Sequence, residues 1–264
     1  MDNLYYIDTH VHLNDEKILS HLDEVINDAL INNVRKMFIV GWDLESSKLA
    51  IELAHRYDFC YAIIGFHPCN IRGYNDFHYN WLEENINDDK VVALGEIGLD
   101  FYWDSTTKEE QLYAFKRQLD IAVKHKKVVS IHSRDASAMT FDTLKEYKGK
   151  LLGGVLHSYS GSVELAKEYI KLNFMFGISG PLTFKNAKTN KEVVAAIDLK
   201  HFISETDSPY LTPHPYRGKE NGPKYIPLIV DEIARIKEVS KEEVMKAIIE
   251  NTNRMFGVYV KMTL

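Results

Sequence analysis

The feature that most constrains the fold is a regular alternation of short apolar runs with longer amphipathic stretches. The runs are rich in β-branched and aromatic residues, which favour strands. They are apolar throughout rather than at every second position, as expected of strands buried on both faces. Eight such runs occur, at residues 5–13, 36–42, 60–68, 91–100, 128–134, 153–161, 174–181 and 202–211. Strands that alternate with helices predict a parallel sheet.

The stretches between the runs have the periodicity of helices. Apolar residues recur at spacings of three and four over 22–30, after the first run, and over 112–123, before the fifth. Eight strand and helix units in 264 residues fit a closed (β/α)₈ barrel, the TIM barrel. The rival fold is an open, doubly wound α/β sheet.

Serine residues mark the starts of three of these helices, because a serine side chain can cap a helix N-terminus. The first of the three is expected over 48–57 and opens at Ser46. The second follows Ser162. The last follows Ser240, which has the spacing of a capping box with Glu243.

Two observations favour the barrel over the open sheet. No glycine-rich fingerprint of a dinucleotide or phosphate loop follows the first run. Chemically distinctive residues lie in runs one, four, five, six and eight, and only a barrel brings the carboxyl ends of all these strands to one rim. We therefore predict one α/β domain, a TIM barrel over residues 1–264.

Charge and composition exclude some classes of function. A net charge of −6 and a pI near 6.0 argue against a protein that grips nucleic acid by charge alone, although bound cations or a local basic patch could still attract phosphates. Two cysteines give no disulfide framework, which suits a reducing compartment. No apolar run reaches the roughly 18 residues of a membrane span, and no signal-peptide pattern opens the chain. We expect a cytoplasmic protein without a membrane or an obligate protein partner.

The first chemical signal is the pair His10 and His12 in the first run. Side chains two residues apart point to the same face of a strand, about 6.6 Å apart along it, so both imidazoles can approach one cation. Chance, or a histidine that belongs to the core, explains an isolated pair of this kind as well as metal binding does. Further histidines at other strand ends favour the metal-binding interpretation.

Four more candidate ligands occupy matching positions. His132 and His157 each interrupt an apolar run just before a polar loop, and Glu96 and Asp207 do the same in runs four and eight. A carboxylate within an apolar run is costly unless it is paired or bound to metal. The alternatives are a buried ion pair for Glu96 and a helix cap or turn for Asp207.

Four imidazoles and two carboxylates exceed the ligands of one tetrahedral ion and suit two divalent ions that share a carboxylate. We assign Glu96 as the bridge. His10, His12 and Asp207 then bind one ion, and His132 and His157 bind the other. Nitrogen and oxygen ligands without thiolate leave Mg²⁺, Mn²⁺, Zn²⁺ and Co²⁺ open. Such a pair activates water for hydrolysis, with Glu96 and Asp207 as the catalytic carboxylates and Asp207 as acceptor of the water proton.

Several segments together resemble the motif series of the TatD family of metal-dependent deoxyribonucleases, which belongs to the amidohydrolase-like superfamily. They read DTHVH from residue 8, GFHP from 65, GEIGLDFY from 95, HSR from 132, HSYSG from 157, ETDSPYL from 205 and RGKENGP from 217. The resemblance implies a TIM-barrel hydrolase with a two-metal centre that cuts DNA phosphodiesters, often from the 3′ end. The six ligands proposed above carry over to this family. The chain departs from the usual family pattern at Ser158, Tyr159, Glu220 and Gly222.

Residues beyond the six ligands are assigned by their position near the strand ends. His67, Arg134 and Arg217 are candidate contacts to a substrate phosphate, although a brace of the rim explains His67 equally well and a rim ion pair could account for Arg134. Asp100 and Glu205 are expected to support the ligands. A serine nucleophile is not expected, because serines beside the ligands suit strand-end hydrogen bonds.

The sequence therefore predicts a metal-dependent deoxyribonuclease, a 3′–5′ exonuclease that acts on single-stranded DNA or 3′ ends. Because the same activated water can attack carbon, the alternative enzyme is a metal-dependent hydrolase of a cyclic amide, ester or aminoacyl bond. Tyr102 and Trp103 follow the fourth run and could stack on a base or cover the rim. A barrel that binds nucleic acid or protein without catalysis is disfavoured by the complete ligand set.

Overall fold

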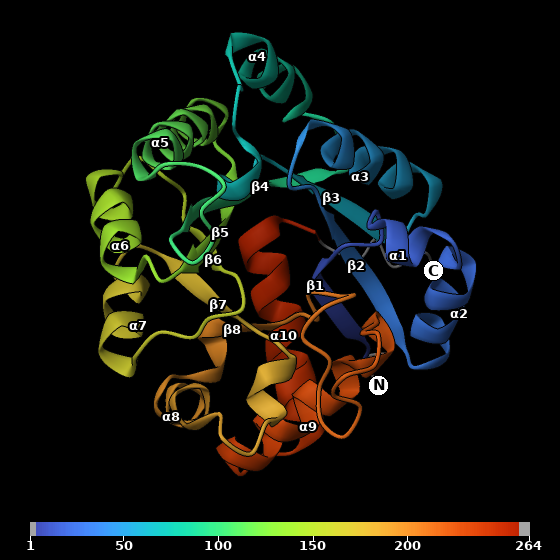
Figure 1. The fold of residues 1–264 in the computed structure, drawn as a ribbon. Coiled ribbons are helices and arrows are strands. Elements are labelled where there is room, and N and C mark those ends of the chain that lie inside the picture. Colours follow the sequence, from blue (N-terminus) through green and yellow to red (C-terminus); the bar gives the residue numbers. More distant parts are fainter. Residues whose placement is uncertain (1–3, 259–264) are drawn as a thin grey trace.

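The computed structural model describes residues 4–258 and contains eight parallel strands that form one nearly closed barrel (Figure 1). The strands follow one another around the barrel in chain order. They are β1 Tyr6–Val11, β2 Val34–Val40, β3 Cys60–Ile64, β4 Val91–Asp100, β5 Val128–Arg134, β6 Gly154–Leu156, β7 Phe174–Ile178 and β8 Phe202–Ser204. The predicted single-domain TIM barrel is confirmed.

Helices surround the barrel and connect successive strands (Figure 1). The α-helices are α1 Glu16–Leu19, α2 Leu22–Ile31, α3 Leu44–Arg56, α4 Asp76–Asn85, α5 Lys108–His125, α6 Ser137–Glu146, α7 Val163–Ile170, α8 Lys188–Ala196, α9 Ile226–Lys237 and α10 Lys241–Phe256. Short 3₁₀ turns are η1 Pro68–Asn70, η2 Gly180–Thr183, η3 Leu199–His201 and η4 Pro223–Tyr225. None of the helices within residues 4–258 is long and apolar enough to cross a bilayer.

The helix starts follow the capping chemistry with one correction. Ser162 caps α7, and Ser240 forms the expected capping box with Glu243 at α10. The start expected at Ser46 is wrong, because α3 begins at Leu44. The side chain of Asp43 accepts the Ser46 N–H at 2.8 Å, and the Ser46 hydroxyl accepts the Asp43 N–H at 2.9 Å. Ser46 therefore closes a capping box from inside the helix.

Six of the eight strands end before their apolar runs do. β1, β2, β3, β6, β7 and β8 stop two to seven residues short of the predicted ends, whereas β4 and β5 end as predicted. Several residues that follow these strands, such as Phe66 and Tyr159, remain buried, but they belong to loops at the barrel rim. Burial in a loop produces the same apolar pattern as burial in a strand, so composition alone overestimates strand length.

The barrel closes between β1 and β8 at the level of the candidate ligands. The Asp207 N–H donates to the His10 carbonyl and the His12 N–H donates to the Ser208 carbonyl, both at 2.9 Å. Val11 and Ser208 form an isolated parallel bridge there. Closure and ligand placement therefore depend on the same backbone contacts.

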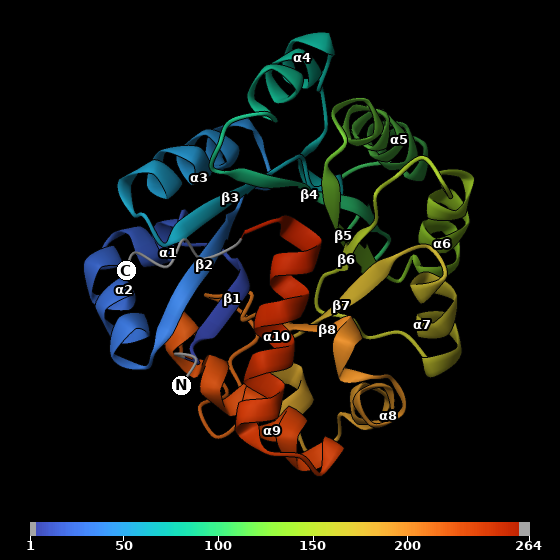
Figure 2. The same ribbon diagram turned by 180° about the vertical axis from the view of Figure 1, so that it is seen from behind.

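One end of the barrel is filled by α10. A second buried cluster inside the barrel includes Ile7, Phe38 and Ile63, together with Met255 and Phe256 from the end of α10. Figure 2 shows α10 lying across this end. The open end is therefore the opposite one, where the strands end and the loops to the following helices begin.

Candidate metal centre

The six predicted ligands come together at the carboxyl end of the barrel. They are His10 from β1, His12 one residue after it, Glu96 from β4, His132 from β5, His157 directly after β6, and Asp207 in the loop after β8. Four of these side chains are almost fully buried: His10, His12, Glu96 and His157. The carboxylate of Asp207 is more exposed than that of Glu96. Residues as far apart in sequence as His10 and Asp207 thus face one shared space.

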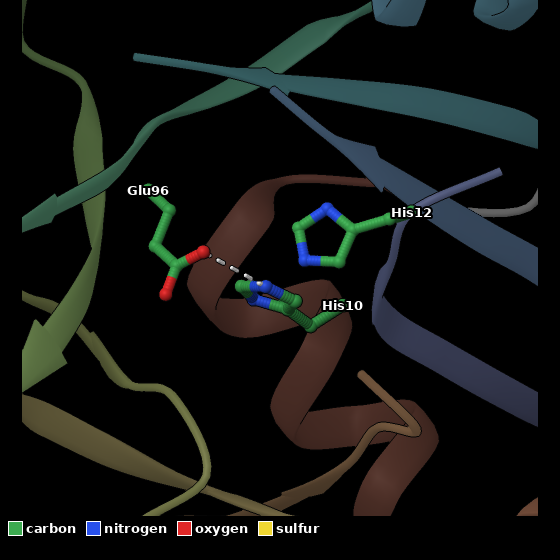
Figure 3. Close-up of side chains that lie close together, drawn as sticks. All are labelled: His10, His12 and Glu96. Atoms are coloured by element: carbon green, nitrogen blue, oxygen red, sulfur yellow. Dashed lines mark ion pairs between the residues drawn. The ribbon is translucent and has the colours of Figure 1, made fainter. Parts of the chain in front are cut away.

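Glu96 lies between two groups of histidines. Its Oε2 is 3.5 Å from His10 Nε2, whereas its Oε1 is 2.8 Å from His132 Nδ1 and 3.7 Å from His157 Nε2. Figure 3 shows the carboxylate directed at His10, with His12 beside it. The two oxygens of one carboxylate thus face different imidazoles.

Asp207 closes the opposite side of the same space. Its Oδ1 lies 3.2 Å from His12 Nε2 and 3.7 Å from the Nε2 atoms of both His10 and His157. Potential ligand atoms also form groups within 4.8 Å of one another, and two of these groups contain Glu96: one with His10 and His12, and one with His67 and His132. Glu96 belongs to both groups.

Three of the four histidines have an outer contact for the ring nitrogen that faces away from the centre. His12 Nδ1 lies 3.0 Å from the Val40 carbonyl, and an N–H there donates to it. His132 Nε2 is 2.8 Å from Asp100 Oδ2, and His157 Nδ1 is 2.9 Å from Glu205 Oε1. Asp100 and Glu205 thus occupy the supporting positions expected of them, and such contacts fix ring orientation and tautomer.

His10 is the exception, and it tests whether a cation fits. Its side chain is 1% exposed, and neither ring nitrogen has a hydrogen-bond partner within residues 4–258. A buried polar atom without a partner costs about 1–3 kcal/mol. Since Nε2 already points at Glu96 and Asp207, a divalent cation between them would satisfy it. The donor set therefore fits a metal ion.

The charges of the centre are strongly coupled. Burial opposes ionisation of Glu96, but the positive charge of His157 and the hydrogen bond from His132 hold its pKa well below the usual value. Burial also opposes protonation of His157 and His132, yet neighbouring carboxylates raise their pKa values to about 10 and about 8. Without cations, protons on these histidines neutralise the carboxylates, so metal binding must displace them.

His67 lies at the edge of this centre, with its ring 4.3 Å from that of His132. Burial and His132 lower the pKa of His67 to about 3, so the ring is neutral. Its Nδ1 accepts the Cys69 N–H at 3.2 Å, which leaves the proton on Nε2. His67 therefore offers one neutral N–H donor.

The two candidate arginines lie in different places. Arg134 follows His132 by two residues on β5, and its guanidinium lies 3.7 Å over the ring of Tyr102. No ion pair within residues 4–258 involves Arg134, so the rim ion pair considered for it is absent there. Arg217 is exposed in the loop after β8, where it lies 4.6 Å from the ring of Phe184 rather than on the six residues.

The serines beside the candidate ligands form local hydrogen bonds, as expected. Ser133 donates to the Thr140 hydroxyl at 3.0 Å, and Ser158 pairs with Ser179 at 2.7 Å. Ser208 donates to the Thr206 hydroxyl at 2.7 Å. Since none is paired with a base, a serine nucleophile has no support.

Sequence reasoning missed two buried residues that hold the ends of β1 and β8. Asp8 accepts hydrogen bonds from the N–H groups of Thr206 and His10 and from the Thr206 hydroxyl. Asn221 donates to the Thr206 carbonyl at 2.9 Å and to the Tyr210 carbonyl. A signal existed for Asp8, because it is a carboxylate within an apolar run, like Glu96. Asn221 gives no such signal in its polar loop.

Comparison with known proteins assigns the chain to a family. The family model described as TatD related DNase matches residues 7–257. The chain is 41% identical to the uncharacterized metal-dependent hydrolase YabD of Bacillus subtilis over 95% of this chain and 98% of that one. It is 33% identical to the uncharacterized metal-dependent hydrolase YcfH of Escherichia coli, over 97% of each chain.

A solved structure agrees. The TatD homologue YJJV of Escherichia coli superposes with a TM-score of 0.92 at 27% identity, over 96% of this chain and 98% of that chain. This likeness in fold, the family match and the centre built from histidines and carboxylates lead to one assignment. The chain belongs to the TatD family of metal-dependent hydrolases.

Proposed function

We propose that the protein is a deoxyribonuclease that hydrolyses phosphodiester bonds of DNA, as a 3′–5′ exonuclease on single strands or 3′ ends. The observation that carries the proposal is the position of Glu96, whose two oxygens face two different groups of histidines. That arrangement favours two divalent cations bridged by one carboxylate, which is the arrangement suited to phosphodiester hydrolysis.

In this proposal each cation has its own ligands. His10, His12 and Asp207 would hold one, His132 and His157 would hold the other, and Glu96 would be shared by both. This division is supported by the distances of His10 and His132 to different oxygens of Glu96. The six residues offer nitrogen and oxygen only, which suits Mg²⁺, Mn²⁺, Zn²⁺ or Co²⁺.

Bound cations would lower the pKa of a water molecule and neutralise charge on the phosphate. Asp207 accepts the proton of that water, since its carboxylate is more open than that of Glu96. His67 donates its neutral Nε2–H to a phosphate or leaving oxygen. Arg134 contacts the phosphate next to the centre, and Arg217 contacts one further along the strand.

The test uses chelated and metal-restored protein with end-labelled single-stranded DNA. We expect metal-dependent shortening from the 3′ end with Mg²⁺ or Mn²⁺, and a loss of about 100-fold or more for Glu96→Gln and Asp207→Asn. His55→Asn, which changes an exposed histidine paired with Asp88, is the matched control and keeps full activity.

Absence of shortening with every restored metal would contradict nuclease action. Turnover of cyclic amides, esters or aminoacyl compounds by the same metal-restored protein would then show that the activated water attacks carbon rather than phosphorus. Cleavage of a circular single strand, which has no 3′ end, would support nuclease action but contradict the proposal that the protein is an exonuclease.

A further inference from the structure

Two aromatic side chains directly after β4 have no role in the metal centre. Tyr102 and Trp103 are 54% and 56% exposed, and their rings meet edge to face at 4.8 Å. Large aromatic rings are usually much more buried than this. Adjacent exposed rings beside a candidate active site therefore suggest a surface that is covered by a ligand.

Backbone hydrogen bonds fix this pair relative to the metal centre. The N–H groups of Tyr102 and Trp103 both donate to Asp100 Oδ1, at 2.9 and 3.1 Å. The other oxygen of Asp100 lies 2.8 Å from His132. One carboxylate thus connects the aromatic pair to a candidate metal ligand.

Arg134 completes the arrangement from the neighbouring strand. Asp100 and Arg134 are partners in the β4–β5 ladder, and the Phe101 N–H donates to the Arg134 carbonyl at 2.9 Å. The guanidinium lies 3.7 Å over the Tyr102 ring and 5.7 Å from the Trp103 ring. A stacked guanidinium keeps its N–H groups free at the edge of the plane, where a phosphate can bind.

The two rings therefore differ in what they leave accessible. Tyr102 has one face covered by Arg134, so it orients the arginine. Trp103 is farther from the guanidinium, and more than half of its surface is open. A flat, open indole beside a guanidinium that has no ion pair within residues 4–258 is complementary to a nucleotide, which joins a planar base to an anionic phosphate.

We propose that Trp103 is a base-stacking subsite and that Tyr102 positions Arg134 on the adjacent phosphate. The proposal rests on the proposed function and deepens it, because it names the contacts to the nucleotide next to the scissile bond. It assigns the base contact to stacking, which tolerates any base, rather than to hydrogen bonds with a particular sequence.

The test measures binding rather than turnover. Metal-loaded protein is titrated with short single-stranded DNA with hydrolysis-resistant phosphorothioate linkages, and with a series that lacks one base at successive positions. One base-free position should weaken binding to the parent protein about 10-fold. Trp103→Ala should weaken binding to intact DNA by a similar factor and lose sensitivity to that position. Trp103→Phe should retain most of the affinity.

The role of Tyr102 is tested by the salt dependence of DNA binding rather than by removal of a base. Tyr102→Ala and Arg134→Ala should each reduce the slope of log affinity against log salt concentration by about one, the value for one phosphate contact. Tyr102→Phe should leave the slope unchanged. Phe77→Ala, which removes an aromatic ring that is 65% exposed on α4, is the control and should bind as the parent does.

A second measurement locates the contact directly. 5-Bromodeoxyuridine at the sensitive position is irradiated in the complex, and the cross-linked peptide is sequenced. Cross-linking to Trp103 supports the subsite. Equal sensitivity to the missing base in the parent and Trp103→Ala, or cross-linking to a different part of the chain, overturns it. If DNA is cleaved in that case, the nuclease stands without this subsite. If the parent neither binds nor cleaves DNA, the proposed function itself fails.

Discussion

His10 differs from the other histidines of the centre because, among residues 4–258, no side chain or carbonyl forms a hydrogen bond with its ring nitrogens. His12, His132 and His157 each have an outer contact, to Val40, Asp100 and Glu205 respectively. His10 is instead confined by packing, since its ring stacks at 3.6 Å on that of His157. The orientation of His10 is thus tied to that of its neighbour, and through it to Glu205.

At the residue scale, Asp100→Asn tests whether outer contacts tune metal binding. The amide oxygen can still accept the Tyr102 and Trp103 N–H groups, but the negative charge beside His132 is lost. We expect the affinity for Mn²⁺ to fall about 10- to 100-fold, measured by titration calorimetry. Asp104→Asn, an exposed change in the same loop, is the control. Equal affinities for the parent and Asp100→Asn would contradict this role.

Gly177 on β7 gives a second prediction at this scale. A Cβ atom there would overlap Oε2 of Glu205, which is 1% exposed and cannot move into solvent. Gly177→Ala should therefore destabilise the fold by about 1–3 kcal/mol and misplace His157. Denaturant unfolding measures the first effect and metal titration the second. Gly222→Ala meets only ordinary contacts and should be neutral in both. A free energy of unfolding of Gly177→Ala equal to that of the parent would show that the Glu205 side chain can move aside.

The six candidate ligands could be picked out of the sequence because each breaks an apolar run in the same way. The supporting positions of Asp100 and Glu205 were also expected, but the contacts of residues farther from the centre were harder to foresee. The proton position on His67 depends on a backbone N–H from Cys69 that only the turn geometry supplies. Arg217 lies on Phe184 because two rim loops meet there, and no pattern within either loop indicates this contact.

At the scale of elements, two of the three helix starts were predicted from their capping serines, whereas most strand ends were not. After β6 and β8 the chain turns at Ser158 and Asp207, which have positive φ angles of 41° and 59°. Residues other than glycine rarely adopt this conformation. Nothing in their composition predicts it, so the apolar runs were extended through these turns.

Lys36 on β2 gives a prediction about the contact between β2 and the end of α10. Its ammonium donates to the Val258 carbonyl, and burial lowers the pKa of Lys36 from 10.5 to about 8. Between these pH values the unfolded chain binds the proton and the folded chain releases it. The contribution of Lys36 to the free energy of unfolding therefore rises with pH across that window.

The comparison is between the parent and Lys36→Met, by urea unfolding at pH values from 7 to about 10.5. We expect the free energy of unfolding of the parent, minus that of Lys36→Met, to increase as the pH rises above about 8. Lys48→Met changes an exposed lysine and should show a constant difference from the parent. Parallel curves for the parent and Lys36→Met would contradict a buried, proton-releasing ammonium.

At the scale of the whole molecule, the barrel closes through the residues that form the centre. His10, His12 and Asp207 contribute backbone hydrogen bonds between β1 and β8 and side chains to the site. A cation held by these side chains and by Glu96 would connect β1 and the loop after β8 to β4. Metal binding should therefore stabilise the entire fold and not only the rim.

Chelation tests this directly. With Mn²⁺ at about 100 times its dissociation constant, binding contributes about 2.7 kcal/mol, which corresponds to a rise in Tm of roughly 5–10 °C by calorimetry. Glu96→Gln should lose most of this rise, because the carboxylate between the two groups of histidines becomes neutral. His55→Asn should keep it. A Tm that ignores added metal would argue that the centre binds no cation in the folded protein.

The position of α10 determines the side from which a substrate can reach the six candidate ligands. Because the end of this helix packs inside the barrel against Ile7, Phe38 and Ile63, the six residues can be approached only from the carboxyl end of the strands (Figure 2). If the protein shortens DNA as proposed, the remaining strand and each released product would have to use that same side. Release of a product and advance of the strand would then compete, so repeated cleavage of one strand would alternate between the two.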